Sequence, residues 1–152
     1  GYCVALTAVR GSSRFVSVVM GADTSDTRFN DARRMLDYAF ANYTTVTLAK
    51  KGETLGRVTI YGGTEDSVPF GAGEDLALLL EKGEESGLEK RIQVEKNLVA
   101  PVKAGDVVAH IIVTRSGKEI SRRPLVAQRT CAKAPLWSLI PRVLREITSL
   151  TW

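Results

Sequence analysis

The sequence predicts an α+β segment, then an all-β module, then a C-terminal amphipathic helix. Three observations lead to this fold class. Residues 1–43 hold two β-branched runs followed by apolar residues at helical spacing. From about Leu48 the pattern changes to short strands separated by Gly and Pro, and the last residues are basic and amphipathic. The 152 residues are 44% hydrophobic and 25% charged, which excludes a disordered or collagen-like chain.

The first two elements are predicted to form a hairpin. Its strands are expected at Tyr2–Val9 and Arg14–Met20, joined by a short turn around Gly11, and both are expected to be largely buried. An Asp/Thr/Ser cluster at 23–26 then supplies helix N-cap candidates. The helix that follows has an apolar stripe of Phe29, Ala32, Leu36, Phe40 and Tyr43. Because two strands make a poor sheet, these residues are expected to be the end of a larger domain.

The middle of the chain is predicted to be an all-β module. Alternation in Arg57–Ile60 and in Arg91–Glu95 indicates strands with one buried and one exposed face. The segment Ser116–Lys118 is typical of a hairpin turn. Strands are expected at Thr54–Tyr61, Leu76–Glu81, Arg91–Glu95, Val107–Thr114 and Ile120–Gln128. The second of these also contains good helix formers, but the glycines that follow it favour a strand.

The tail from Pro135 to Trp152 is predicted to be an amphipathic helix. The chain has 21 Lys plus Arg against 17 Asp plus Glu, and residues 129–152 hold four basic residues and one acidic residue, 4 − 1 = +3. Such a helix either lies flat on a membrane surface or packs on a protein, and both interpretations stay open. No apolar run approaches the ~20 residues that span a bilayer. The mild positive charge does not require nucleic acid, which is not an expected partner.

The sequence lacks the short motifs of several enzyme classes. Ser-x-x-Lys, Ser-x-Asn, Lys-Thr-Gly, Gly-x-Ser-x-Gly, the P-loop and HExxH are all absent, and Gly71–Gly73 is interpreted as a turn. His110, the single histidine, lies in a predicted strand and is expected to be structural. Cys3 and Cys131 have no metal-ligand spacing, and a disulfide between them stays open. No metal or cofactor is expected.

Several segments together resemble a known family. They are Gly1–Ala8, Arg14–Ala22, Arg28–Phe40, Ala100–Val108 and Arg122–Ala127. In order and spacing they are similar to the end of the serine-type D-Ala-D-Ala carboxypeptidases, the low-molecular-mass penicillin-binding proteins of the peptidase S11 type. The resemblance covers essentially the whole chain.

The resemblance implies three regions. Residues 1–47 would be the C-terminal remnant of a transpeptidase or β-lactamase-like catalytic domain, 48–129 a β-sandwich domain, and 130–152 a membrane-anchor helix. The parent protein would remove the terminal D-Ala from peptidoglycan stem peptides through a serine acyl-enzyme, at the outer face of the bacterial cytoplasmic membrane. Stem peptides and β-lactams would bind through the missing catalytic part. The chain itself would lack the nucleophile and be inactive.

The resemblance also implies two sets of functional residues. Arg28 matches an arginine that receives the carboxylate of the substrate; the residues alone also allow a solvated side chain or a pair with Asp31. The residues expected to anchor the helix are Trp137, Ile140, Arg142, Leu144, Arg145, Ile147 and Trp152. An alternative function is a non-catalytic spacer or protein-binding β module of the cell envelope. The unpaired edge of the hairpin further suggests a homo-oligomer.

Overall fold

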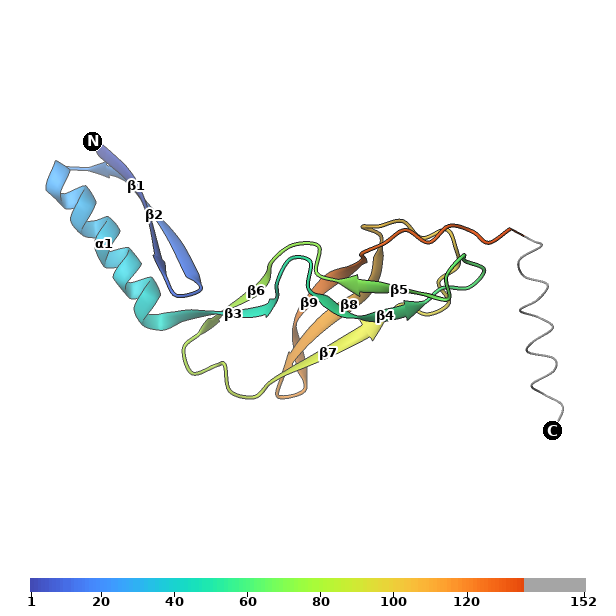
Figure 1. Ribbon diagram of the computed structural model, residues 1–152. Coiled ribbons are helices and arrows are strands. Elements are labelled where there is room, and N and C mark those ends of the chain that lie inside the picture. The colour runs from blue at the N-terminus through green and yellow to red at the C-terminus, as the bar shows by residue number, and fades with distance from the viewer. Residues whose placement is uncertain (136–152) are drawn as a thin grey trace. The chain divides into compact units, whose positions relative to one another are not determined.

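The computed structural model describes residues 1–135. Their contacts define two units, Gly1–Leu48 with Ala77–Leu88, and Ala49–Leu76 with the residues from Glu89 onward. The elements in chain order, labelled in Figure 1, are β1 (Tyr2–Arg10), β2 (Ser13–Ala22), α1 (Ser25–Asn42), β3 (Tyr43–Ala49), β4 (Thr54–Thr59), β5 (Ser67–Gly71), β6 (Leu76–Glu81), β7 (Leu88–Val94), β8 (Val107–Arg115) and β9 (Lys118–Ala127).

The first unit contains the predicted hairpin and helix. β1 and β2 pair antiparallel, and the turn between them places Gly11 at φ +59°, a conformation that glycine adopts without strain. Thr24 caps α1, because its hydroxyl accepts a hydrogen bond from the Thr27 N–H at 3.1 Å. The helix buries Ala32, Leu36 and Phe40. Phe40 contacts Phe15 of β2 edge to face, with ring centroids 4.9 Å apart. The helix therefore packs directly on the hairpin.

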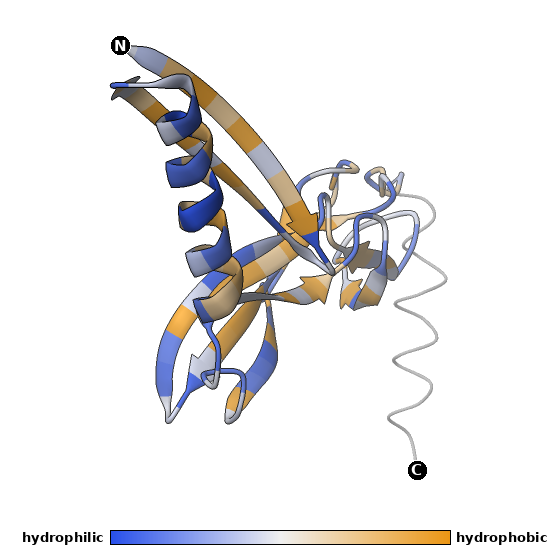
Figure 2. Ribbon diagram, turned by 90° about the vertical axis from the view of Figure 1, so that its left-hand side faces the viewer, coloured by the Kyte–Doolittle hydropathy of each residue, from blue (hydrophilic) through white to orange (hydrophobic). Residues whose placement is uncertain are grey.

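The prediction that both hairpin strands are largely buried is wrong. Side chains alternate along each strand, as the bands of colour in Figure 2 show, and α1 covers one face of the hairpin only. On the other face Val16 is 66% exposed and Met20 is 78% exposed. Phe29, predicted to belong to the buried stripe of the helix, is also exposed, and Tyr43 begins β3 instead of ending the helix.

A second small sheet in this unit pairs β3 with β6. The strand β3 follows α1 without a loop, and the Lys82 N–H donates to the Asn42 carbonyl at 2.8 Å. Ser13 of the hairpin hydrogen-bonds the Thr45 hydroxyl at 2.9 Å. The predicted strand Leu76–Glu81 is confirmed as β6. The strands β3 and β5 were not predicted: no Gly or Pro separates β3 from α1, and β5 contains Pro69.

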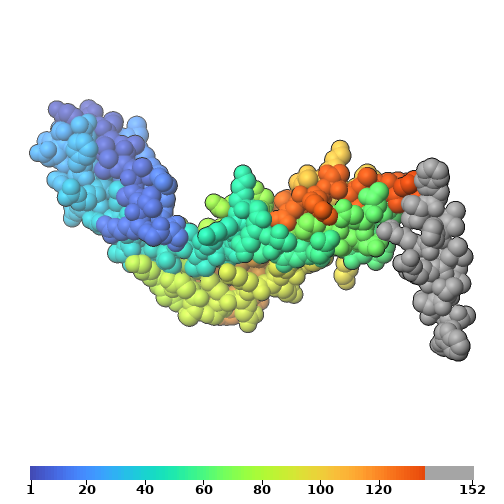
Figure 3. All heavy atoms as spheres, in the orientation of Figure 1, coloured from blue at the N-terminus to red at the C-terminus, as the bar shows by residue number. Residues whose placement is uncertain are grey.

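The second unit is a five-stranded sheet in the order β4-β5-β9-β8-β7. The predicted turn between β8 and β9 is confirmed: Ser116 and Gly117 both have positive φ, as a two-residue type I′ turn requires. The core of this unit is apolar, with fully buried Val68, Phe70, Val108, Ile112, Val113 and Leu125. Figure 3 shows the orange-red segment after β9 lying against the green one before β5, where the Thr64 N–H donates to Ala132.

Close packing explains two residue types that the sequence analysis discussed, the glycine at 71 and the cysteines. Of the predicted turn Gly71–Gly73, Gly71 is the last residue of β5 and Gly73 lies in the bend that follows. A Cβ on Gly71 would lie 1.9 Å from the Glu53 carbonyl oxygen. Cys131 is fully buried and free, with its sulfur filling the space beside Gly63. Cys3 is free and exposed, so the two cysteines are not joined in this structure.

The strand β7 departs from the predicted pattern of one buried face. Its residues are exposed on both faces from Glu89 to Val94, and Ile92 and Val94 are 38% and 37% exposed. β7 is an end strand, so only β8 adjoins it. Apolar alternation therefore identified the strand correctly, but the face that carries Ile92 and Val94 is exposed instead of buried.

Candidate functional site

Arg28 lies in the first turn of α1 and connects the helix to β1. One terminal guanidinium nitrogen donates to the Cys3 carbonyl at 3.1 Å, and the other donates to the Ser25 hydroxyl at 3.2 Å. The guanidinium carbon lies 4.9 Å from the ring centroid of Phe29 and 5.4 Å from that of Tyr2. Arg28 therefore fixes the start of the helix on the first strand.

The guanidinium retains hydrogen-bonding capacity after these contacts. Its Nε is buried without a hydrogen-bond partner in the described part of the chain, and each terminal nitrogen carries a second N–H. A cation with unused donors suits a carboxylate, which accepts two parallel hydrogen bonds from it. The pairing with Asp31 that the sequence allowed is replaced by contacts to Cys3 and Ser25.

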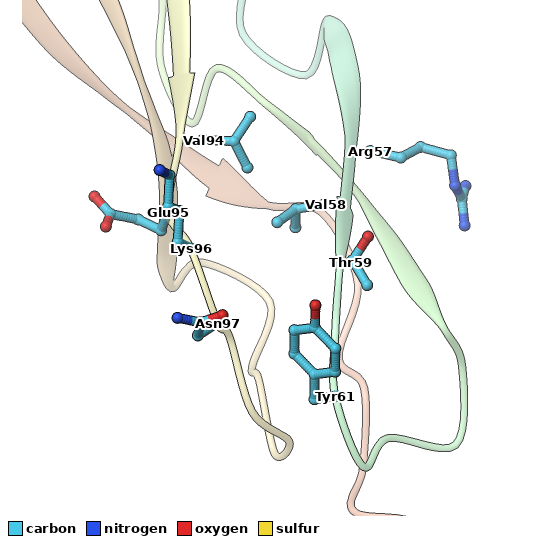
Figure 4. A pocket seen from close by; sticks show the side chains of 8 residues that line it. All are labelled: Arg57, Val58, Thr59, Tyr61, Val94, Glu95, Lys96 and Asn97. Atoms are coloured by element: carbon cyan, nitrogen blue, oxygen red, sulfur yellow. The ribbon is translucent and has the colours of Figure 1, made fainter. Parts of the chain in front are cut away.

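A second candidate site is a slot on the β module, drawn in Figure 4. It has a volume of about 400 Å³ and lies between the end of β4 and the end of β7. Its lining residues are Arg57, Val58, Thr59, Tyr61, Val94, Glu95, Lys96 and Asn97. In this view Val58 and Val94 point toward one another across the slot, and Arg57 points away from it. The apolar floor and polar rim suit binding of a ligand.

The charged groups around the slot are mostly engaged. Glu95 lies 3.4 Å from Nδ1 of His110, the single histidine of the sequence. Arg57 donates from Nε to the Ser67 hydroxyl at 3.0 Å and from a terminal nitrogen to the Ser67 carbonyl at 2.9 Å. Within residues 1–135, no group of three or more His, Cys, Asp or Glu side chains is arranged to hold a metal ion.

A further ion pair lies on β9. Arg122 donates from two nitrogens to the two carboxylate oxygens of Glu119, at 2.9 and 3.1 Å. These hydrogen bonds lower the pKa of the Glu119 carboxyl from its ordinary value, and Arg91 acts in the same direction through its charge. Both side chains are on the surface, so the pair contributes little to the stability of the fold.

The predicted anchor residues Trp137, Ile140, Arg142, Leu144, Arg145, Ile147 and Trp152 lie outside the described residues. Among residues 1–135, no helix is both long and apolar enough to cross a membrane.

Sequence reasoning missed the slot. Tyr61 and Val94 come at the ends of strands, where a residue on an apolar face was expected to be buried. Asn97, whose φ is +58°, turns the chain beside them. The sequence does contain a signal for the slot: an aromatic residue, Tyr61, and an apolar residue, Val94, each come where a strand ends. The two residues become neighbours only through the order of the strands in the sheet, which the sequence does not give.

Comparison with known proteins defines the class. Residues 43–133 match the family model described as penicillin-binding protein 5, C-terminal domain. This stretch contains the strands of both the small β3–β6 sheet and the five-stranded sheet. The chain therefore belongs to the C-terminal domain family of penicillin-binding protein 5, a mostly β family.

Curated relatives and solved structures agree with this assignment. The chain is 28% identical over 148 residues to D-alanyl-D-alanine carboxypeptidase DacF of Bacillus subtilis, covering 97% of this chain and 38% of that relative. It is 35% identical over 127 residues to DacC of Escherichia coli, covering 83% and 32%. The structure of penicillin-binding protein 5 from Haemophilus influenzae superposes with a TM-score of 0.74 at 29% identity, covering 88% and 39%.

The extent of these matches bears on function. The chain spans about a third of the length of the curated relatives it matches. The relatives are carboxypeptidases by name, and the names concern proteins considerably longer than 152 residues. The similarity includes residues before position 43, because the match to DacF covers 97% of the chain.

Proposed function

We propose that this chain is the C-terminal part of a D-alanyl-D-alanine carboxypeptidase that trims the terminal D-Ala from peptidoglycan stem peptides. The single observation that carries the proposal is similarity to named carboxypeptidases along nearly the entire chain, beginning before the C-terminal domain. The hairpin and α1 are then the terminal elements of a transpeptidase-type catalytic domain. The β module from residue 48 to 129 is its β-sandwich companion, followed by an anchor segment at 130–152.

In this proposal the chemistry belongs to residues outside the printed sequence. A serine attacks the peptide carbonyl, D-Ala leaves, and water hydrolyses the acyl-enzyme. The 152 residues contain none of the Ser-x-x-Lys, Ser-x-Asn or Lys-Thr-Gly motifs. The chain alone is therefore proposed to be inactive and to bind no β-lactam covalently.

Arg28 is the residue of this chain that we assign to substrate binding. The exposed terminal carboxylate of D-Ala-D-Ala is a bidentate acceptor that matches a guanidinium. The unused donors of Arg28, and its fixation by Cys3 and Ser25, support this role because a preorganised cation loses little entropy on binding.

The location follows from the same proposal. The cell envelope is the site of penicillin-binding proteins that act on peptidoglycan, and we place this protein at the outer face of the cytoplasmic membrane. The basic, amphipathic residues 136–152 would lie in the headgroup layer, where each Arg contributes about 1 kcal/mol near anionic lipids. We also propose that the protein forms a homo-oligomer through the unpaired edge of the hairpin.

The test is hydrolysis by the full-length protein that contains this segment. Incubation with a pentapeptide ending in D-Ala-D-Ala should release free D-Ala, and a peptide ending in L-Ala should be left intact. Release from neither peptide, under conditions in which the Escherichia coli DacC protein is active, would leave the alternative of a non-catalytic spacer or binding module.

A further inference from the structure

Two aromatic rings from different elements border the guanidinium of Arg28. The guanidinium carbon lies 4.9 Å from the ring centroid of Phe29, the next residue of α1, and 5.4 Å from that of Tyr2, the first residue of β1. Both distances are within the roughly 6 Å over which the face of an aromatic ring attracts a cation. Arg28 therefore has a cation–π contact on each of the two elements that it joins.

Neither ring is part of the buried core. Tyr2 is 48% exposed and Phe29 is 45% exposed, whereas α1 buries a different stripe of residues against the hairpin. Packing of the helix on the hairpin therefore does not explain an aromatic residue at position 29. The contact that the two rings share is the one with Arg28.

The hydrogen bonds of Arg28 hold its guanidinium without neutralising it. One terminal nitrogen donates to the Cys3 carbonyl at 3.1 Å and the other to the Ser25 hydroxyl at 3.2 Å. Both acceptors are uncharged, so these two contacts leave the positive charge available to an anion. A carboxylate in either place would instead compensate the charge within the chain.

The two rings restrain the same cation without occupying its donors. A cation–π contact is made with the face of the ring and does not require an N–H group, so each terminal nitrogen keeps its second N–H. Arginine is rich in rotamers, and ordering such a side chain when a ligand binds costs free energy. Because two hydrogen bonds and two rings already hold Arg28, much of this ordering precedes binding.

We propose that Tyr2 and Phe29 are positioning residues for Arg28, and that they set how strongly the site selects a substrate with a free terminal carboxylate. They act through the guanidinium, which they hold in the orientation that the carboxylate requires. This inference rests on the proposed function, because it requires that Arg28 binds the carboxylate of the substrate.

The experiment measures carboxylate preference in the full-length protein that contains this segment. Preference is the ratio of kcat/KM for a peptide ending in D-Ala-D-Ala to kcat/KM for the same peptide ending in a carboxamide. Leucine is apolar but has no aromatic face. Tyr2→Leu and Phe29→Leu should therefore each lower the preference about two- to fivefold, and the double variant should lower it about tenfold.

Conservative variants separate the aromatic face from other properties of the two residues. Tyr2→Phe and Phe29→Tyr keep a ring at each position and should restore the preference to within about twofold of the starting protein. A role in folding alone predicts something different, namely an equal loss of kcat/KM for the carboxylate and the carboxamide peptide.

Tyr38→Leu is the matched control, because it makes the same change at another exposed aromatic residue of α1. At 1.5 Å per residue, Tyr38 lies about 15 Å further along the helix than Arg28. The preference should stay within about twofold. Equal circular dichroism spectra and unfolding midpoints show that the variants fold.

A second measurement does not depend on activity. In full-length protein with labelled arginine, ring currents should shift the side-chain proton resonances of Arg28 upfield, because the group lies over the two rings. Each leucine variant should move these resonances back toward their ordinary positions. Resonances that neither variant moves would overturn the proposal, because the rings would then not contact the cation in solution.

The kinetic results distinguish this inference from the proposed function. Release of D-Ala from neither peptide by the unchanged protein would overturn the proposed function and this inference with it. A preference that Arg28→Gln lowers but Tyr2→Leu and Phe29→Leu leave unchanged would overturn this inference alone. Equal losses for both peptides, or a loss as large in Tyr38→Leu, would also overturn it.

Discussion

At the scale of single residues, Arg28 combines a structural and a proposed functional role. It holds α1 on β1 through Cys3 and Ser25, and its buried Nε has no partner in the described chain. An unsatisfied buried donor is costly, so natural proteins keep few of them. In the proposed role a substrate carboxylate would accept hydrogen bonds from the terminal nitrogens, because the Nε is buried.

The role of Arg28 is tested in the full-length protein. Arg28→Gln should lower kcat/KM for a peptide with a free terminal carboxylate by about tenfold to a hundredfold, as expected for a lost charged hydrogen bond. For the same peptide ending in a carboxamide, the loss should be much smaller. Ser25→Ala is the matched control, because it removes one structural contact of Arg28 and keeps the charge. Equal losses for both peptides would show that Arg28 acts on structure alone.

The Glu119–Arg122 pair gives a prediction about pH. The two hydrogen bonds from Arg122 lower the pKa of Glu119, so any stabilisation from this pair is present above the ordinary pKa of Glu and is lost as pH falls through the lowered value. In Arg122→Gln the pKa of Glu119 should rise toward its ordinary value, as carboxyl NMR titration would measure. An unchanged pKa would mean that Arg122 does not hold the carboxylate in solution.

At the scale of elements, local signals predicted most of the secondary structure. The cluster of cap candidates at 23–26 and an apolar stripe that includes Ala32, Leu36 and Phe40 identified α1, and Ser116–Lys118 identified the turn between β8 and β9. What failed was burial, at the open face of the hairpin and at β7. Burial depends on which elements lie opposite a strand, and the local pattern at Val16 or Val94 does not contain that information.

The cap of α1 is a direct test at this scale. Thr24→Ala should lower the free energy of unfolding of the first unit by about 1 kcal/mol, because the Thr27 N–H loses its acceptor. Thr24→Ser keeps the hydroxyl and should restore most of the stability. Urea unfolding monitored by circular dichroism measures both. If the Ala and Ser variants are equally stable, the hydroxyl does not act as a cap.

At the scale of the whole molecule, the chain consists of two units with different relations to function. The residues of the first unit include Arg28, and those of the second include the slot and the single histidine. The family and the order of the segments could be predicted from the sequence, because the resemblance depends on local stretches such as Ala100–Val108. The slot could not, because its two walls are about 35 residues apart and meet only through the sheet order.

The central claim is that this chain is the C-terminal part of a serine-type carboxypeptidase. Intact-mass spectrometry after incubation with a β-lactam tests it most directly, on the 152-residue chain and on the full-length protein that contains it. The account predicts a covalent adduct of one β-lactam on the full-length protein and none on the chain. No adduct on the full-length protein, under conditions that label the Escherichia coli DacC protein, would contradict it.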